Sequence, residues 1–182
     1  MGLYKLGKVC YTNIIKVNFV FVCIWRFGMD PLKTIYTSDT SETEAAGAAL
    51  ATEMLSNPSI PRFIALYGDL GVGKTAFVRG FASVVAPNSL VRSPTFALVN
   101  EYRSATLPLF HFDMYRIDSE DDLISIGYDD YLNRHGVCLV EWSEKIPDSI
   151  PEEFVRVTIV KNDPQKTDSR VITFELVTEV NA

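Results

Sequence analysis

A chain of 182 residues is long enough for one domain with a sizeable core, and its 47% hydrophobic and 22% charged residues are ordinary for a globular protein. The net charge of −6 argues against tight, direct binding of RNA or DNA by this chain alone. Its three cysteines, Cys10, Cys23 and Cys138, lack metal-ligand spacing and predict reduced thiols in a cytosol-like compartment, without a disulfide framework.

Residues 1–34 differ from the rest of the chain and are expected to form an extension to a single domain over residues 35–182. Lysines precede an apolar run, Val17–Trp25, that is too short to cross a bilayer as a helix, so we expect no membrane association. Two interpretations stay open: a presequence, or a native start at Met29 instead of Met1. No A-x-A cleavage site follows the apolar run, which favours the start at Met29.

The domain opens with a predicted short edge strand at Ile35–Thr37, followed by a helix that runs to about Leu55. The segment Ser41–Glu44 fits a capping box, in which the Ser41 hydroxyl caps the helix and Glu44 reaches back. Asn57-Pro58 should end the helix. The expected apolar face of the helix contains Ala46, Leu50 and Met54.

The next segments form a strand, a glycine-rich loop and a helix. Phe63–Tyr67 is typical of a buried strand, and Ala76–Ala82 of a helix that ends near Pro87-Asn88. Between them, Gly68-Asp69-Leu70-Gly71-Val72-Gly73-Lys74-Thr75 fits G-x-x-x-x-G-K-[ST], the phosphate-binding loop of P-loop nucleotidases. Glycines let backbone N–H groups turn inward around an anion, and the following helix adds its positive dipole end.

Within this loop, Lys74 is expected to reach the β- and γ-phosphates of a nucleotide, while the Thr75 hydroxyl ligates Mg²⁺. The strand–loop–helix context is the one that the motif requires. The alternative, a glycine-rich turn that happens to hold a lysine, is therefore disfavoured.

Further strands follow along the chain. Phe96–Val99 and Leu107–Phe112 are predicted strands separated by a polar turn, and a short acidic helix begins at Ser119. The continuous apolar run Val137–Val140 is typical of a strand buried on both faces. Two late, alternating strands, expected to be antiparallel, flank a loop at Asp163–Lys166; they are Val155–Val160 and Val171–Val177.

Two carboxylates follow apolar strands and are candidates to act beside the phosphate loop. Glu141 follows Val137–Val140, and Asp113 follows the strand that ends at Phe112. Both should reach the carboxyl edge of the sheet, where ligand sites of α/β proteins lie. One could ligate the metal while the other orients the attacking water.

Several other residues near these motifs allow two interpretations. Ser93-Pro94-Thr95 could close a hydroxyl onto the γ-phosphate or be a proline-restrained turn. Arg116 could stabilise phosphate charge, although pairing with the acidic helix at Glu120–Asp122 is preferred. His111 is expected to be structural, and Trp142 is either simple packing or a lid over the site.

Taken together, the motifs resemble the TsaE (YjeE) family, the small ATPase of bacterial tRNA threonylcarbamoyladenosine synthesis. The resemblance runs from about Thr37 to Leu176. It is carried by Gly68–Thr75, Ser93–Tyr102, His111–Arg116 and Val137–Trp142. It implies an α/β, P-loop NTPase-like three-layer fold with a mixed, mainly parallel central sheet.

The resemblance also implies a function and its partners. It implies a cytoplasmic, weak, Mg²⁺-dependent ATPase that associates with TsaB and TsaD homologues and meets tRNA indirectly through that complex. TsaD transfers the threonylcarbamoyl group to an adenosine beside the anticodon, and ATP hydrolysis by the TsaE-like protein supports turnover of the assembly without being the transfer chemistry.

Carried onto this sequence, the resemblance implies site residues. Leu70, Gly71, Val72, Gly73, Lys74 and Thr75 match the ATP loop, and Thr75 and Glu141 match the Mg²⁺ positions. Asp113 matches an acidic residue needed for activity, which with Lys74 and Glu141 gives the expected catalytic set. Trp142 matches a functional aromatic, and Thr40 or Thr43 is assigned near the adenine.

One departure and two alternatives remain. The family usually has a second threonine after the lysine, where this chain has Ala76, so ATP binding should survive while the hydrolysis rate is open. The alternatives are a small-molecule kinase, disfavoured because no long Arg-bearing lid segment separates the later strands, and a nucleotide-gated binding module with negligible hydrolysis.

Overall fold

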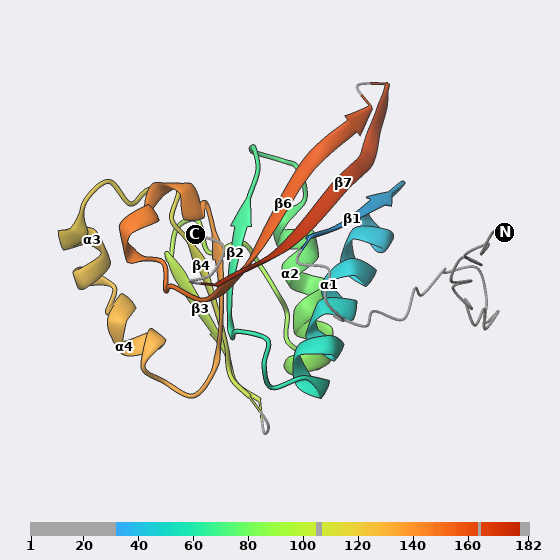
Figure 1. The fold of residues 1–182 in the computed structure, drawn as a ribbon. Helices are drawn as coiled ribbons and strands as arrows, with labels where there is room; N and C mark the ends of the chain where they lie inside the picture. Colours follow the sequence, from blue (N-terminus) through green and yellow to red (C-terminus); the bar gives the residue numbers. More distant parts are fainter. Residues whose placement is uncertain (1–31, 105–106, 164, 179–182) are drawn as a thin grey trace, which may run out of the picture.

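The computed structural model describes residues 32–104, 107–163 and 165–178, and within them a seven-stranded sheet with helices on both sides (Figure 1). The expectations for residues 1–31, including the apolar run, Met29 and two of the cysteines, lie outside the described residues. The strands are β1 (Leu32–Thr37), β2 (Phe63–Tyr67), β3 (Val99–Tyr102), β4 (Leu109–Asp113), β5 (Val137–Glu141), β6 (Phe154–Asp163) and β7 (Lys166–Val177). The helices are α1 (Thr40–Ser56), α2 (Lys74–Val85), α3 (Glu120–Ser125) and α4 (Tyr128–Leu132), with short 3₁₀ turns η1 (Ser143–Lys145) and η2 (Pro147–Ser149).

The sheet is mixed, with a parallel centre, as predicted. The strand order is β1-β7-β6-β2-β5-β4-β3. The four central strands, β6, β2, β5 and β4, run parallel to one another. At the edges, β3 pairs antiparallel with β4, and β7 pairs antiparallel with both β6 and β1. The two late strands are antiparallel to each other, but β6 also extends the parallel centre beside β2.

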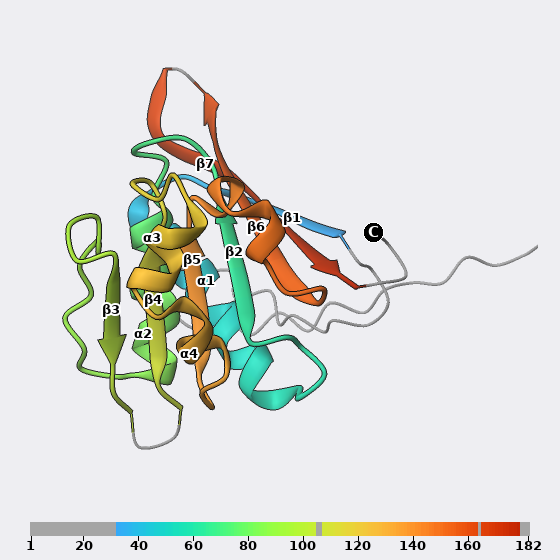
Figure 2. The same cartoon turned by 90° about the vertical axis from the view of Figure 1, so that its left-hand side faces the viewer.

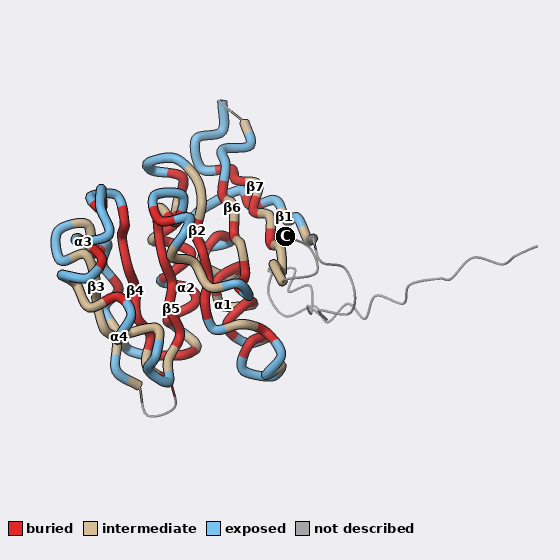
Figure 3. The backbone as a smooth tube through the Cα atoms, turned by 60° about the vertical axis from the view of Figure 1, so that its left-hand side comes forward, coloured by how far each residue is buried: buried red, intermediate tan, exposed pale blue. Residues whose placement is uncertain are grey.

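Helices α1 and α2 cover one face of the sheet and α3 and α4 the other, which gives the predicted three layers (Figures 1 and 2). Each interface has its own hydrophobic cluster: the first includes Leu50 of α1 and Phe77 of α2, and the second includes Tyr128 of α4. Between them, every residue of β4 and β5 is buried (Figure 3). Within the described residues, no helix is long and apolar enough to cross a membrane.

The predicted first helix exists, but its cap was assigned wrongly. The N-cap is Asp39, whose side chain accepts a hydrogen bond from the Glu42 amide at 2.8 Å. Ser41 lies inside the first turn and donates its hydroxyl to Asp39. An extended aspartate two residues earlier satisfies the free amides of the first turn, so the helix starts before the predicted capping box. The edge strand is confirmed and starts earlier, at Leu32.

The prediction of a strand at Phe96–Val99 is wrong apart from its last residue. Strand β3 begins at Val99, because Leu98 adopts a left-handed φ of 63° that no strand allows and donates its amide to the carbonyl of Pro94. The predicted loop at Asp163–Lys166 is shorter than expected, since these two residues pair across the β6–β7 hairpin. The acidic helix is confirmed, with a capping box formed by Ser119 and Asp122.

Candidate nucleotide-binding site

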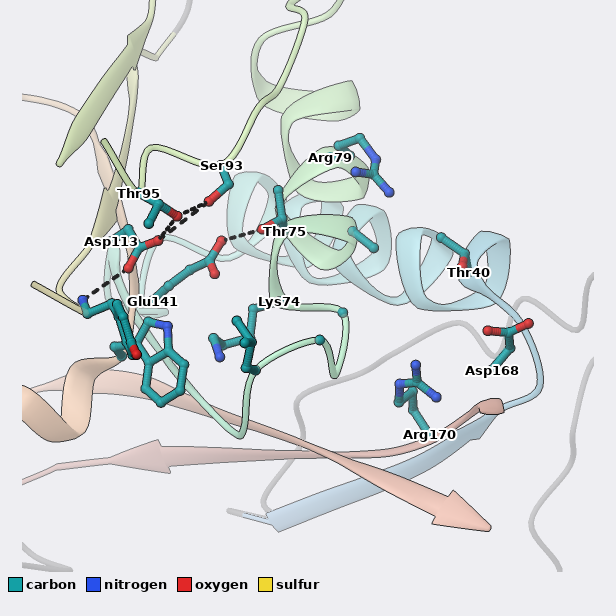
Figure 4. Close-up of a pocket in the computed structure, with 16 residues that line it drawn as sticks. Thr40, Lys74, Thr75, Arg79, Ser93, Thr95, Asp113, Glu141, Asp168 and Arg170 are labelled. Atoms are coloured by element: carbon teal, nitrogen blue, oxygen red, sulfur yellow. Dashed lines mark hydrogen bonds between the residues drawn. The ribbon is translucent and has the colours of Figure 1, made fainter. Parts of the chain in front are cut away.

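A cavity of about 520 Å³ lies where the carboxyl ends of β4 and β5 meet the start of α2. It has two ends: one holds Asp113 and Glu141, and the other Thr40, Asp168 and Arg170 (Figure 4). The residues that line it are Thr40, Leu70, Gly71, Gly73, Lys74, Thr75, Ala76, Arg79, Ser93, Thr95, Asp113, Tyr115, Glu141, Trp142, Asp168 and Arg170.

The glycine-rich loop has the backbone that a phosphate cradle requires. Gly68, Gly71 and Gly73 have φ values of 131°, 75° and 108°, which only glycine adopts readily. Gly73 is the N-cap of α2, so the helix starts at Lys74 and directs its positive dipole end at the cavity. Of the residues Leu70–Thr75 assigned to ATP, all line the cavity except Val72, whose side chain is buried in the core.

Lys74 is held over the loop that it belongs to. Its ammonium donates to the carbonyls of Gly68, at 2.5 Å, and Asp69, at 3.1 Å, and lies 3.9 Å from the ring centroid of Trp142. Burial lowers the pKa of Lys74 from its ordinary value, while the nearby carboxylates of Glu141 and Glu144 favour the charged form. The lysine therefore places a positive charge inside the cradle.

Glu141 lies beside the first turn of α2, as predicted from its place after a buried strand. Its Oε1 accepts a hydrogen bond from the Thr75 hydroxyl at 2.9 Å and lies 2.8 Å from Nε2 of His111. Both His111 and Glu141 are almost completely buried. Side-chain alternation explains the meeting, because both residues point to the α1–α2 face of their strands.

Asp113 pairs in register with Glu141 and forms a second carboxylate–hydroxyl group. Its Oδ2 accepts from the hydroxyls of Thr95, at 2.6 Å, and Ser93, at 3.4 Å, while Oδ1 accepts from the Tyr115 amide at 3.0 Å. The segment around Pro94 is thus tied to the end of β4 (Figure 4). Whether a hydroxyl of this segment meets a phosphate stays a prediction.

Two aromatic residues, Tyr115 and Trp142, line the cavity side by side. Trp142 lies 5.1 Å from Tyr115, measured between ring centroids, and both line the cavity, consistent with Trp142 covering Lys74.

Arg116 was expected to pair with the acidic helix. Among the described residues its guanidinium instead lies 4.8 Å from the ring centroid of Phe96, a residue that is 86% exposed.

Sequence reasoning missed part of the site, namely Arg79, Asp168 and Arg170. Arg170 of β7 donates Nε to the Val72 carbonyl at 2.6 Å and so fixes the loop from the opposite side. No motif marks it, because it occurs in an alternating strand. Of the two threonines assigned near the adenine, Thr40 lines the cavity, whereas Thr43 is buried and hydrogen-bonded to Thr37.

The donor set suits a hydrated Mg²⁺ bound together with phosphates. Mg²⁺ takes oxygen ligands, keeps several waters and needs only one or two protein groups when phosphates complete the shell. The Thr75 hydroxyl and the Glu141 carboxylate, in contact at the cavity wall, are such a pair. Within the described residues no group of three or more His, Cys, Asp or Glu side chains could hold a metal by itself.

A parallel sheet centre, a glycine loop at the end of β2 and a lysine held at the start of α2 define a P-loop α/β fold. The comparison with protein families is specific. The family model described as "Threonylcarbamoyl adenosine biosynthesis protein TsaE" matches residues 37–172, and the chain belongs to the TsaE family.

Individual relatives agree with this assignment. The chain is 41% identical over 114 residues to a protein of Bacillus subtilis named "tRNA threonylcarbamoyladenosine biosynthesis protein TsaE", which covers 63% of this chain and 69% of the relative. A Nostoc protein of the same name is 31% identical over 150 residues, 80% of this chain and 89% of the relative. The crystal structure of YdiB from B. subtilis superimposes with a TM-score of 0.66 at 32% identity, over 82% of this chain and 88% of that one.

Proposed function

We propose that this chain binds ATP with Mg²⁺ and hydrolyses it weakly, in support of threonylcarbamoyl transfer to the adenosine beside the anticodon of tRNA. In this proposal it acts in the cytoplasm with homologues of TsaB and TsaD, meets tRNA only through that complex, and is not itself the transferase. The names of its relatives support the pathway.

The observation that carries the nucleotide part is the contact of the Thr75 hydroxyl with the Glu141 carboxylate at 2.9 Å, beside the cradle of Gly68–Lys74. In P-loop enzymes, the loop hydroxyl and a carboxylate from a neighbouring strand together hold Mg²⁺ on the β- and γ-phosphates. In our proposal Mg²⁺ neutralises phosphate charge, and Lys74 adds charge-assisted hydrogen bonds to the phosphates.

Asp113 is proposed to orient the attacking water. It is 3% exposed and held by three donors, so its carboxylate is fixed in position beside the cavity. Asp113→Asn should therefore lower hydrolysis much more than ATP affinity. Equal losses of hydrolysis and affinity would instead assign Asp113 to the metal.

The test of the whole proposal is ATPase activity with and without the TsaB and TsaD homologues and tRNA. We expect slow release of ADP and phosphate by the chain alone, a change in rate with the partners, and nucleotide-dependent association in a pull-down.

Lys74→Ala should abolish nucleotide binding, whereas Lys145→Ala, at an exposed lysine paired with Asp118, should not. Phosphate transfer to a metabolite would support a kinase instead, and absence of any association would reject the partnership.

A further inference from the structure

His111 is the feature of the site that the nucleotide loop does not explain. It lies in the middle of β4, in register with Leu139 of β5 and Asn100 of β3, and is completely buried. Its Nε2 lies 2.8 Å from Oε1 of Glu141. Its Nδ1 is buried without a hydrogen-bond partner among the described residues.

The tautomer of His111 follows from its partner. A carboxylate only accepts hydrogen bonds, which makes Nε2 the donor in the contact between His111 and Glu141. Oε1 of Glu141 then accepts two bonds, one from His111 and one from Thr75. The other ring nitrogen, Nδ1, is buried without a partner among the described residues, which is unfavourable for folding whether it donates or accepts.

An apolar side chain of similar size would avoid that penalty, since the neighbouring positions of β4 and β5 on this face, Leu109 and Leu139, belong to buried parts of the core. A histidine here therefore gives up apolar packing, and among the described residues its one side-chain hydrogen bond is with Glu141. The sequence predicts a structural role for His111. Its contact with Glu141 indicates instead that the ring holds this carboxylate in position.

We propose that His111 is a positioning residue for the metal carboxylate. With Thr75 it fixes Oε1 of Glu141, so that Oε2, for which the described residues provide no hydrogen bond, is the oxygen directed to Mg²⁺ or its water. The inference rests on the proposed Mg²⁺–nucleotide binding. Groups that orient metal ligands in this way typically contribute about 10–100-fold to metal affinity.

The test measures ATP affinity by calorimetry over a Mg²⁺ titration and in EDTA, together with the melting temperature. His111→Leu should require roughly 10–100-fold more Mg²⁺ for the same gain in ATP affinity, with ATP affinity in EDTA unchanged and a cooperative melting transition that shows the variant to be folded. His111→Gln can place an amide donor near the position of Nε2 and should retain the Mg²⁺ response. His111→Asn is too short to do so and should lose it.

His135→Leu is the matched control, because His135 is exposed and contacts Arg62. It should leave the Mg²⁺ response unchanged. Equal behaviour of the Gln and Asn variants, or an unchanged Mg²⁺ response in the Leu variant, would overturn the inference while leaving the proposed function intact. A native chain that binds no nucleotide with Mg²⁺ would overturn both.

Discussion

The close packing of α1 against α2 gives a prediction in which steric overlap and helix propensity change the free energy of unfolding in opposite directions. A Cβ atom added at Gly80 of α2 would overlap the carbonyl oxygen of Glu44 in α1 and lie 2.7 Å from the Glu44 Cα atom. Ordinary contacts of this kind are about 3.5–4.0 Å. Because the obstructing atoms are backbone, no rotation of a side chain can relieve the overlap, and the helices must separate by roughly 1 Å.

The magnitude for Gly80→Ala follows from two opposing terms. Overpacking of a tight core costs typically about 1–3 kcal/mol, and a backbone obstruction justifies the upper end. Alanine in a helix interior recovers about 1 kcal/mol relative to glycine. The expected net loss is therefore about 2 kcal/mol of unfolding free energy, or roughly 4–8 °C in melting temperature for a chain of this size.

The assay is urea and thermal unfolding followed by far-UV circular dichroism. Gly47→Ala, which obstructs the same interface from α1 by approaching Phe77 and Phe81, should give a loss of the same sign. Ser83→Ala, at an exposed position of α2, is the control and should change stability by less than about 0.5 kcal/mol. A Gly80→Ala variant as stable as the native chain, or more stable, would refute the close approach.

Three further outcomes are expected. Gly68→Ala, at a φ of 131° and against a β6 carbonyl, should abolish ATP binding and lower the melting temperature, as calorimetry and thermal unfolding can check. Arg170→Gln removes the charged bond to the loop and should weaken ATP binding by roughly 10–100-fold, whereas Arg156→Gln, at a half-exposed ion pair, should not. Burial raises the pKa of Cys138 to about 12, so iodoacetamide at pH 8 should modify this thiol only after unfolding, and modification in the native state, detected by peptide mass spectrometry, would contradict its burial.

The phosphate loop and the two carboxylates could be predicted from the sequence, because each is identified by a short continuous segment of residues. Gly68–Thr75 needs only a preceding strand and a following helix, and both were visible as apolar segments. Asp113 and Glu141 follow short buried strands, so their arrival at one edge of a parallel sheet depends only on strand direction.

Arg170 and His111 could not be assigned in this way, because their roles depend on partners far along the chain. Arg170 contacts a loop residue 98 positions earlier, and His111 a carboxylate 30 positions later. Alternation placed each side chain on a face of its strand but not opposite any particular group. The wrong prediction of the α1 cap has a local cause. Asp39 and Ser41 are both favourable N-cap residues, and in the structure Asp39 is the N-cap.

The register of β4 and β5 brings charged residues from separate sequence motifs together at one end of the cavity. Asp113 and Glu141 are paired neighbours, each nearly buried, and Lys74 is the cation that lies between the loop and these strands. Two acidic side chains thus face one ammonium at this end of the cavity, and buried negative charge is costly unless it is compensated. Donors from Thr75, His111 and Thr95 reduce that cost without removing the charge. Under the proposed function, a divalent cation would compensate that charge and bring its own affinity for phosphate, so we expect this end of the cavity to favour a metal–nucleotide complex over the nucleotide alone.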